Sequence, residues 1–136
     1  MLSGETVLAF QSVFLVLLFV SIAFRMKGNY LVHGIIMTVL TAGAWVAVVG
    51  TLPMFMDSSI MQNYTSPSST LVVSGLHLFI GVAELVFGTW LVALWRPRST
   101  DFAAKSKRIW QSIVILWVLA YMVGLLLYVA LTTTFL

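Results

Sequence analysis

The chain contains no cysteine and very little charge, and each absence excludes whole classes of protein. Without cysteine there is no disulfide framework, no thiolate metal site and no thiol redox chemistry. Only 8% of the 136 residues are charged, whereas 61% are hydrophobic. Soluble domains carry about 25% charged and about 45–50% apolar residues. This composition cannot cover a water-soluble globule with polar surface, which excludes a soluble enzyme.

Long apolar runs take the place of the missing polar surface. Each of four runs has the roughly 17–25 residues that a membrane-spanning helix needs. The segments between them are basic, or rich in proline, serine and threonine, as is typical of loops, and one of these loops is expected to begin at Pro53. We predict a single membrane domain over residues 1–136, with spans at about 6–24, 30–52, 71–95 and 109–131.

The positively charged residues are confined to the first and third predicted loops, whereas the only charged residue of the second loop is Asp57. By the positive-inside rule, the first and third loops are expected to be cytoplasmic, with both termini outside (N-out/C-out). Cations at these positions anchor helices at lipid headgroups, so no nucleic-acid partner is expected. The seven are Arg25, Lys27, Arg96, Arg98, Lys105, Lys107 and Arg108.

Small and polar side chains recur at helical spacing in every span, which in lipid marks the faces that pack inward. Short first and third loops make neighbouring spans antiparallel. The predicted fold is therefore an all-α integral membrane protein, an antiparallel up-down bundle of four transmembrane helices. The inward stripes are Gln11, Phe14, Leu18, Ser21 and Arg25; His33, Met37 and Thr41; Ser74, His77, Gly81, Glu84 and Gly88; and Trp110, Val114, Trp117, Tyr121, Gly124 and Tyr128.

Glu84 is the most informative residue, because helical rise places it about 16 Å from the end of its span, near the bilayer midplane. A lone carboxylate there costs several kcal/mol, so it should be protonated or paired. Its expected neighbours by depth are Thr41, Trp117 and Tyr121. Two interpretations stay open: a proton-relay or cofactor-contacting group, and a neutral side chain that hydrogen-bonds across helices as structural glue.

His77 precedes Glu84 by seven residues on the same face. That spacing corresponds to about 10 Å along the helix, too far for both side chains to bind one metal ion. Its neighbours by depth are Gln11 and Tyr128, and we expect one of them to hydrogen-bond the imidazole.

His33 lies near the opposite end of the predicted bundle, and we expect it close to Gln111 as a capped interfacial histidine. Its depth differs from that of His77 by about 15 Å. Because the two axial ligands of a haem approach the iron at nearly the same depth, this chain alone is not expected to hold a bis-histidine haem. A single histidine could still contribute to a site shared with a partner.

The predicted outer loop carries two further signals. Met54, Met56 and Met61 supply thioethers, which suit Cu(I), although methionine is also an adaptable apolar filler at an interface. The triplet that begins at Asn63 is a glycosylation sequon on the side of the membrane where such a modification occurs.

Short motifs between residues 25 and 128 link the chain to a known family. They are the segment Gly28–Met37 around His33, then His77, the entrance Lys107–Trp110 to the last span, and the aromatic segment Tyr121–Tyr128. Together they resemble the small four-helix membrane proteins of domain-of-unknown-function family 420, the CtaM/YozB-like group. The family has a His-Arg pair where this chain has Lys107 and Arg108, so only the two histidines carry over.

The resemblance implies a protein of the cell membrane that is associated with making active haem–copper terminal oxidases. We therefore expect a non-catalytic accessory subunit or assembly factor of the respiratory chain, with lipid and other membrane subunits as partners. No cofactor is expected on this chain alone, although His33 or His77 could contact haem or copper at a shared site. The alternative is a membrane redox or proton-relay module in which Glu84 and His77, with Tyr121 and Thr41 nearby, act next to a haem, quinone or copper site.

Overall fold

The computed structural model describes residues 4–57, 62, 68–95, 101–107 and 109–133. This part of the chain forms α1 (Gly4–Met26), α2 (Tyr30–Met56), α4 (Ser68–Leu94), α5 (Phe102–Ser106) and α6 (Ile109–Thr133). All of these helices except α5 are long enough and apolar enough to cross a membrane. The chain is therefore a multi-pass membrane protein, as the apolar runs predict.

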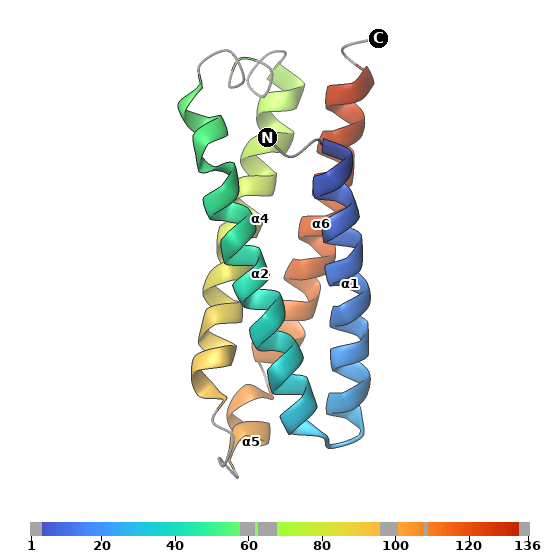
Figure 1. Cartoon of the computed structure of the whole chain (residues 1–136), viewed down its shortest axis with the longest axis vertical. Helices are drawn as coiled ribbons and strands as arrows, with labels where there is room; N and C mark the ends of the chain where they lie inside the picture. The colour runs from blue at the N-terminus through green and yellow to red at the C-terminus, as the bar shows by residue number, and fades with distance from the viewer. Residues whose placement is uncertain (1–3, 58–61, 63–67, 96–100, 108, 134–136) are drawn as a thin grey trace.

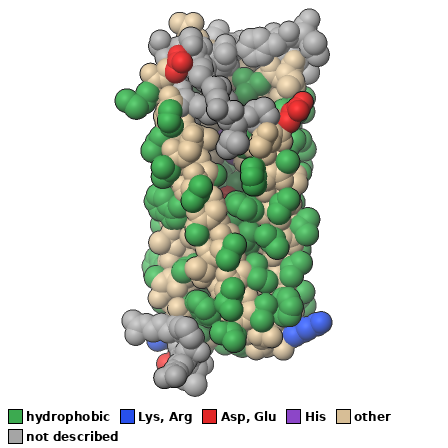
Figure 2. Space-filling view, in the orientation of Figure 1, with side chains coloured by type: hydrophobic (Ala, Val, Ile, Leu, Met, Phe, Trp, Pro, Cys, Tyr) green, Lys and Arg blue, Asp and Glu red, His purple; other side chains and the backbone are tan. Residues whose placement is uncertain are grey.

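The four long helices stand side by side as an antiparallel up-down bundle (Figure 1), which confirms the predicted fold class. Each long helix packs on its neighbours in the chain, and α6 closes the ring against α1. The end at which α1 begins and α6 ends carries Glu5 and Asp57 and is named the acidic end. The opposite end holds α5 and the α1–α2 turn and is named the basic end. Figure 2 shows apolar side chains over the middle of one face, with charged side chains near its two ends.

A three-residue turn joins α1 to α2, and Gly28 makes it feasible. Gly28 has a φ of +74°, in the left-handed region that residues with a Cβ rarely adopt. The backbone N–H of Asn29 then donates to the Phe24 carbonyl at the end of α1. The side-chain oxygen of Asn29 accepts a bond from the Val32 N–H at 3.2 Å and so caps the start of α2.

Two of the predicted loops are partly helical. The helix α2 continues through Pro53 to Met56, so the prediction that the loop begins at Pro53 is wrong. Proline within the last turn removes only one helical hydrogen bond, at a point where several carbonyls already lack a donor. The basic loop contains α5, which is too short to give a recognisable period in the sequence. Its residues Phe102 and Ser106 are buried, and the Ser106 hydroxyl donates to the Phe102 carbonyl at 2.6 Å.

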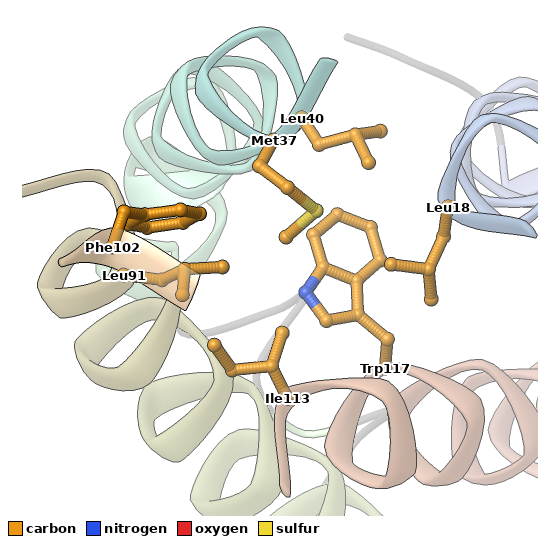
Figure 3. Packing of buried hydrophobic residues seen from close by; sticks show 7 residues of the cluster. All are labelled: Leu18, Met37, Leu40, Leu91, Phe102, Ile113 and Trp117. Atoms are coloured by element: carbon orange, nitrogen blue, oxygen red, sulfur yellow. The ribbon is translucent and has the colours of Figure 1, made fainter. Parts of the chain in front are cut away.

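The main apolar core occupies the half of the bundle nearer the basic end. There Trp117 belongs to a cluster that includes residues from all four long helices and from α5 (Figure 3). In the acidic half, the buried apolar cluster comes from α4 and α6 alone and consists of Ile80, Ala120 and Val123. Buried apolar side chains are thus concentrated in the half of the bundle nearer the basic end. The core residues are Leu18, Met37, Leu40, Leu91, Phe102, Ile113 and Trp117.

Small residues allow close approach between helices at Gly34 and at Gly88, of which only Gly88 belongs to a predicted inward stripe. A Cβ at Gly34 would overlap the indole of Trp95, so this glycine lets α2 pack against the end of α4. A Cβ at Gly88 would lie 3.2 Å from the Thr41 hydroxyl.

The predicted inward face of α2 is confirmed, since His33, Met37 and Thr41 are at most 6% exposed.

Candidate functional site

His77 lies inside the bundle against α6 and α1. The gap at Gly124 makes room for it: a Cβ there would lie 3.0 Å from the His77 Cε1 and 3.0 Å from the Gln11 Oε1. The ring also interacts with the backbone of Ala120 on α6. Its Nδ1 is buried and has no hydrogen-bond partner among the described residues. Gln11 is therefore a neighbour of His77, as predicted, but the imidazole interacts with α6 backbone in place of a side-chain bond to Gln11 or Tyr128.

Glu84 lies two helical turns closer to the basic end, about 10 Å from His77 along α4. It is partly buried, and no residue in the described part of the chain hydrogen-bonds or ion-pairs with it. The hydroxyl of Thr41 and the Nε1 of Trp117 are buried and have no partner in the described part of the chain. The Tyr121 hydroxyl lies 3.1 Å from the Ser12 hydroxyl and bonds there. The interhelical bond that the structural-glue interpretation requires is therefore not found among these residues.

The unpaired polar atoms have a physical consequence. The set formed by Gln11, Thr41, His77 and Glu84 is named here the interior polar set. Buried polar groups in folded proteins nearly always have a hydrogen-bond partner, and leaving one unpaired costs about 1–3 kcal/mol. Groups of this kind bind water, protons or the polar atoms of another molecule. The interior polar set therefore presents a carboxyl group and an imidazole, which are side chains that can pass protons, with hydrogen-bonding capacity that the described residues do not use.

The apolar core separates the interior polar set from the basic end. Trp117, Met37 and Leu18 point toward one another across the bundle in Figure 3. The Trp117 ring also packs on Phe14, with 6.1 Å between ring centroids at a tilted angle. None of the seven buried residues that form this cluster is ionisable. The main apolar core therefore lies between Glu84 and the basic end of the bundle.

His33 lies toward the basic end and binds α1. Its Nδ1 is 2.8 Å from the Ser21 hydroxyl, and the same nitrogen is 3.2 Å from the Ser21 carbonyl oxygen. Both residues are almost completely buried, at 2% and 0% exposure. The expectation that Gln111 is its neighbour is wrong, because Gln111 is exposed and α1 supplies the partner. The inward stripe of α1 contained this signal, since Ser21 is a small polar residue on a buried face.

The two histidines lie in different clusters and do not face each other across a common space. His33 packs beside Phe102, with ring centroids 6.3 Å apart, whereas His77 lies beside Gly124. The burial of His33 leaves no open face of its ring for a partner's haem or metal, so His77 is the more accessible of the two. Among the described residues, no group of three or more His, Cys, Asp or Glu side chains is placed to hold a metal ion.

The predicted lipid anchors divide into two kinds. Lys27, Lys105 and Lys107 are exposed at the basic end, as anchors should be. Arg25 is different, since only 8% of it is exposed, and the sequence alone did not distinguish it from the others. Arg96, Arg98, Arg108, Met61 and Asn63, together with the Met54 side chain, lie outside the described residues.

Phe102 and Trp110 were not identified from the sequence as neighbours of Arg25. Their rings lie 5.8 Å and 5.1 Å from its guanidinium carbon. The available signal was weak: Phe102 is an isolated aromatic residue in a polar loop.

Compared with known proteins, the chain matches no family model, no curated protein and no solved structure.

Proposed function

We propose that this chain is a non-catalytic accessory subunit or assembly factor of a larger energy-converting membrane complex. Its partner would be a haem–copper terminal oxidase or another membrane enzyme that contains haem or copper. The motifs around His33 and His77, through their resemblance to family 420, support the choice of partner. The chain would lie in the cell membrane. The concentration of cations at the basic end supports an orientation in which the first and third loops are cytoplasmic.

The observation that carries this proposal is the incomplete pairing of the interior polar set. Buried atoms of His77 and Thr41 lack partners among the described residues, and so does the carboxyl group of Glu84. Such groups gain partners from water or from a second molecule. His33 and His77 belong to separate clusters. This separation favours a cofactor that the partner holds, because the two histidines of this chain are not placed to bind one together.

Affinity purification and a gene deletion together test this role. We expect the tagged chain, extracted from native membranes in mild detergent, to recover oxidase subunits in constant ratio by mass spectrometry. We also expect deletion to lower the haem absorbance of the assembled oxidase in membranes by at least about tenfold, since assembly factors act before the active enzyme forms. A tagged unrelated four-helix membrane protein is the control.

The two readouts separate the two forms of the proposal. Constant recovery indicates a permanent subunit, whereas a haem defect without recovery indicates a transient assembly factor. Recovery of the chain alone, together with normal oxidase haem in the deletion strain, would contradict both forms.

The unpartnered carboxyl group favours a second candidate, a proton-relay module that uses Glu84 and His77 next to a haem, quinone or copper site. A group that passes protons must be reachable by water and must not be held in a fixed hydrogen bond. Glu84 meets the second condition among the described residues.

Infrared spectroscopy of the purified chain in lipid tests this second candidate. We expect a protonated-carboxyl band that is absent in Glu84→Gln and that shifts within seconds after transfer to D2O. The band should persist in Glu5→Gln, which removes an exposed carboxylate at the acidic end. A Glu84 band that resists exchange for hours would show a sealed carboxyl group and would exclude a relay.

A further inference from the structure

An open pocket of about 420 Å³ lies at the basic end, between the α1–α2 turn, α5 and the start of α6. Its volume falls in the roughly 300–1,000 Å³ range of small-ligand sites. The polar and aromatic lining comes from Arg25, Tyr30, Lys107 and Trp110, and the apolar lining comes from Met26, Ala103 and Ala104. The pocket is distinct from the interior polar set, because the apolar core lies between them.

Arg25 is the central feature of this pocket. Its guanidinium carbon lies 5.5 Å from the Tyr30 ring centroid, 5.8 Å from that of Phe102 and 5.1 Å from that of Trp110. Three aromatic rings around one cation stabilise it by cation–π attraction and fix its position. The arginine is more than nine-tenths buried, and its Nη1 has no hydrogen-bond partner among the described residues.

The rings leave the Nη1 hydrogens of this guanidinium without an acceptor among the described residues. Aromatic faces attract the charge but accept none of the five N–H bonds as an oxygen would. A buried cation is costly unless a counter-ion or acceptor pairs with it, and no acidic side chain in the described segments forms an ion pair with Arg25. Phosphate oxygens match a guanidinium in charge and in planar, two-bond geometry. The exposed Lys107 adds a second positive charge at the mouth of the pocket.

The position of the pocket indicates the source of the phosphate. Arg25 is the penultimate residue of α1, Tyr30 begins α2, and Trp110 is the second residue of α6. All three lie where membrane spans end, which is the level of the lipid headgroups, and tyrosine and tryptophan are enriched there. A phosphate at this level belongs to a phospholipid more readily than to a solute.

We propose that this pocket binds the phosphate of an acidic phospholipid headgroup, with the guanidinium of Arg25 as its hydrogen-bonding anchor and the ammonium of Lys107 as a second cation. Tyr30 and Trp110 hold the guanidinium in place and contact the glycerol region. The site selects acidic over zwitterionic lipid, because the choline cation of a zwitterionic headgroup is repelled by Lys107. This differs from general anchoring by surface lysines, which has no fixed stoichiometry.

Native mass spectrometry of the full chain in neutral detergent tests the proposal with three probes: dioctanoyl phosphatidylglycerol, dioctanoyl phosphatidylcholine and glycerol phosphate. We expect one phosphatidylglycerol per chain, bound at least about fivefold more tightly than phosphatidylcholine. Arg25→Gln should weaken that binding about tenfold or more, as loss of a charge-assisted bidentate bond does. Lys107→Gln should weaken it about fivefold.

Lys27→Gln is the matched control, because it removes a cation of the same turn that does not line the pocket. We expect it to change affinity by about twofold or less. If Arg25→Gln does not fold, the test is the comparison of phosphatidylglycerol affinity between Lys107→Gln and Lys27→Gln, since both substitutions alter exposed side chains. Equal losses in these two variants, or equal affinity for the two lipids, would overturn the proposal. Binding of glycerol phosphate as tight as that of the lipid would overturn the assignment to phospholipid.

Discussion

Replacing Trp117 with alanine is expected to lower the free energy of unfolding by about 3–5 kcal/mol, the usual loss for a large aromatic residue removed from a core. Trp117 is only 7% exposed, and it belongs to a core cluster that includes residues of every long helix. Lipid chains cannot enter the space that it leaves, so the packing contacts are lost without replacement. The measurement is unfolding of the purified chain by dodecyl sulfate in mixed micelles.

Two further variants isolate the cause. Trp117→Phe keeps most of the volume and removes an indole N–H that no described residue accepts, so we expect a change of less than about 1.5 kcal/mol. Trp90→Ala removes a tryptophan that is 54% exposed on the outer face and should have a much smaller effect than Trp117→Ala. Equal losses for the two alanine variants would contradict the placement of Trp117 at the centre of the core.

The second large effect is expected at Glu84, and it has the opposite sign. Glu84→Leu should raise the free energy of unfolding by about 1–3 kcal/mol, because it replaces an unpaired polar group inside the bundle with an apolar one of similar size. Glu84→Gln should change stability less, since the amide is polar and equally unpaired. A stabilised Glu84→Leu variant would show that the carboxyl group is present at a cost to the fold, as is typical of functional residues in membrane spans.

Glu5→Gln is the control for Glu84, because Glu5 is exposed at the acidic end and its charge is hydrated. We expect that variant to lie within about 0.5 kcal/mol of the original chain. A loss of stability of more than about 1 kcal/mol in both Glu84 variants would instead show that Glu84 makes a stabilising bond. Such a result would restore the interpretation of Glu84 as structural glue.

The sequence determined the fold class because the physical constraint is strong. Four apolar runs of the required length must form helices in lipid, where every backbone N–H and C=O needs an internal partner. Short connections at Gly28 and around α5 make neighbouring helices antiparallel. The inward face of α2 followed from the spacing of His33, Met37 and Thr41, and all three are buried.

The candidate residues were also visible in the sequence, because ionisable side chains in apolar spans are rare. His77 and Glu84 stand out for this reason, and their separation follows from helical rise alone. Their hydrogen bonds could not be predicted, because depth along an axis does not fix rotation or side-chain conformation. Tyr121 bonds to Ser12 and not to Glu84, although depth places both within reach.

Only the tertiary structure decided what surrounds each charge. Arg25 and Lys27 belong to the same basic turn, yet one is caged by three rings and the other is exposed. The difference depends on Phe102, which comes from a helix 77 positions later in the sequence (102 minus 25). The sequence by itself thus determined that this chain crosses a membrane, through local composition and period. Which polar groups are paired, caged or left without a partner depends on contacts between distant segments, and those exist only in the folded bundle.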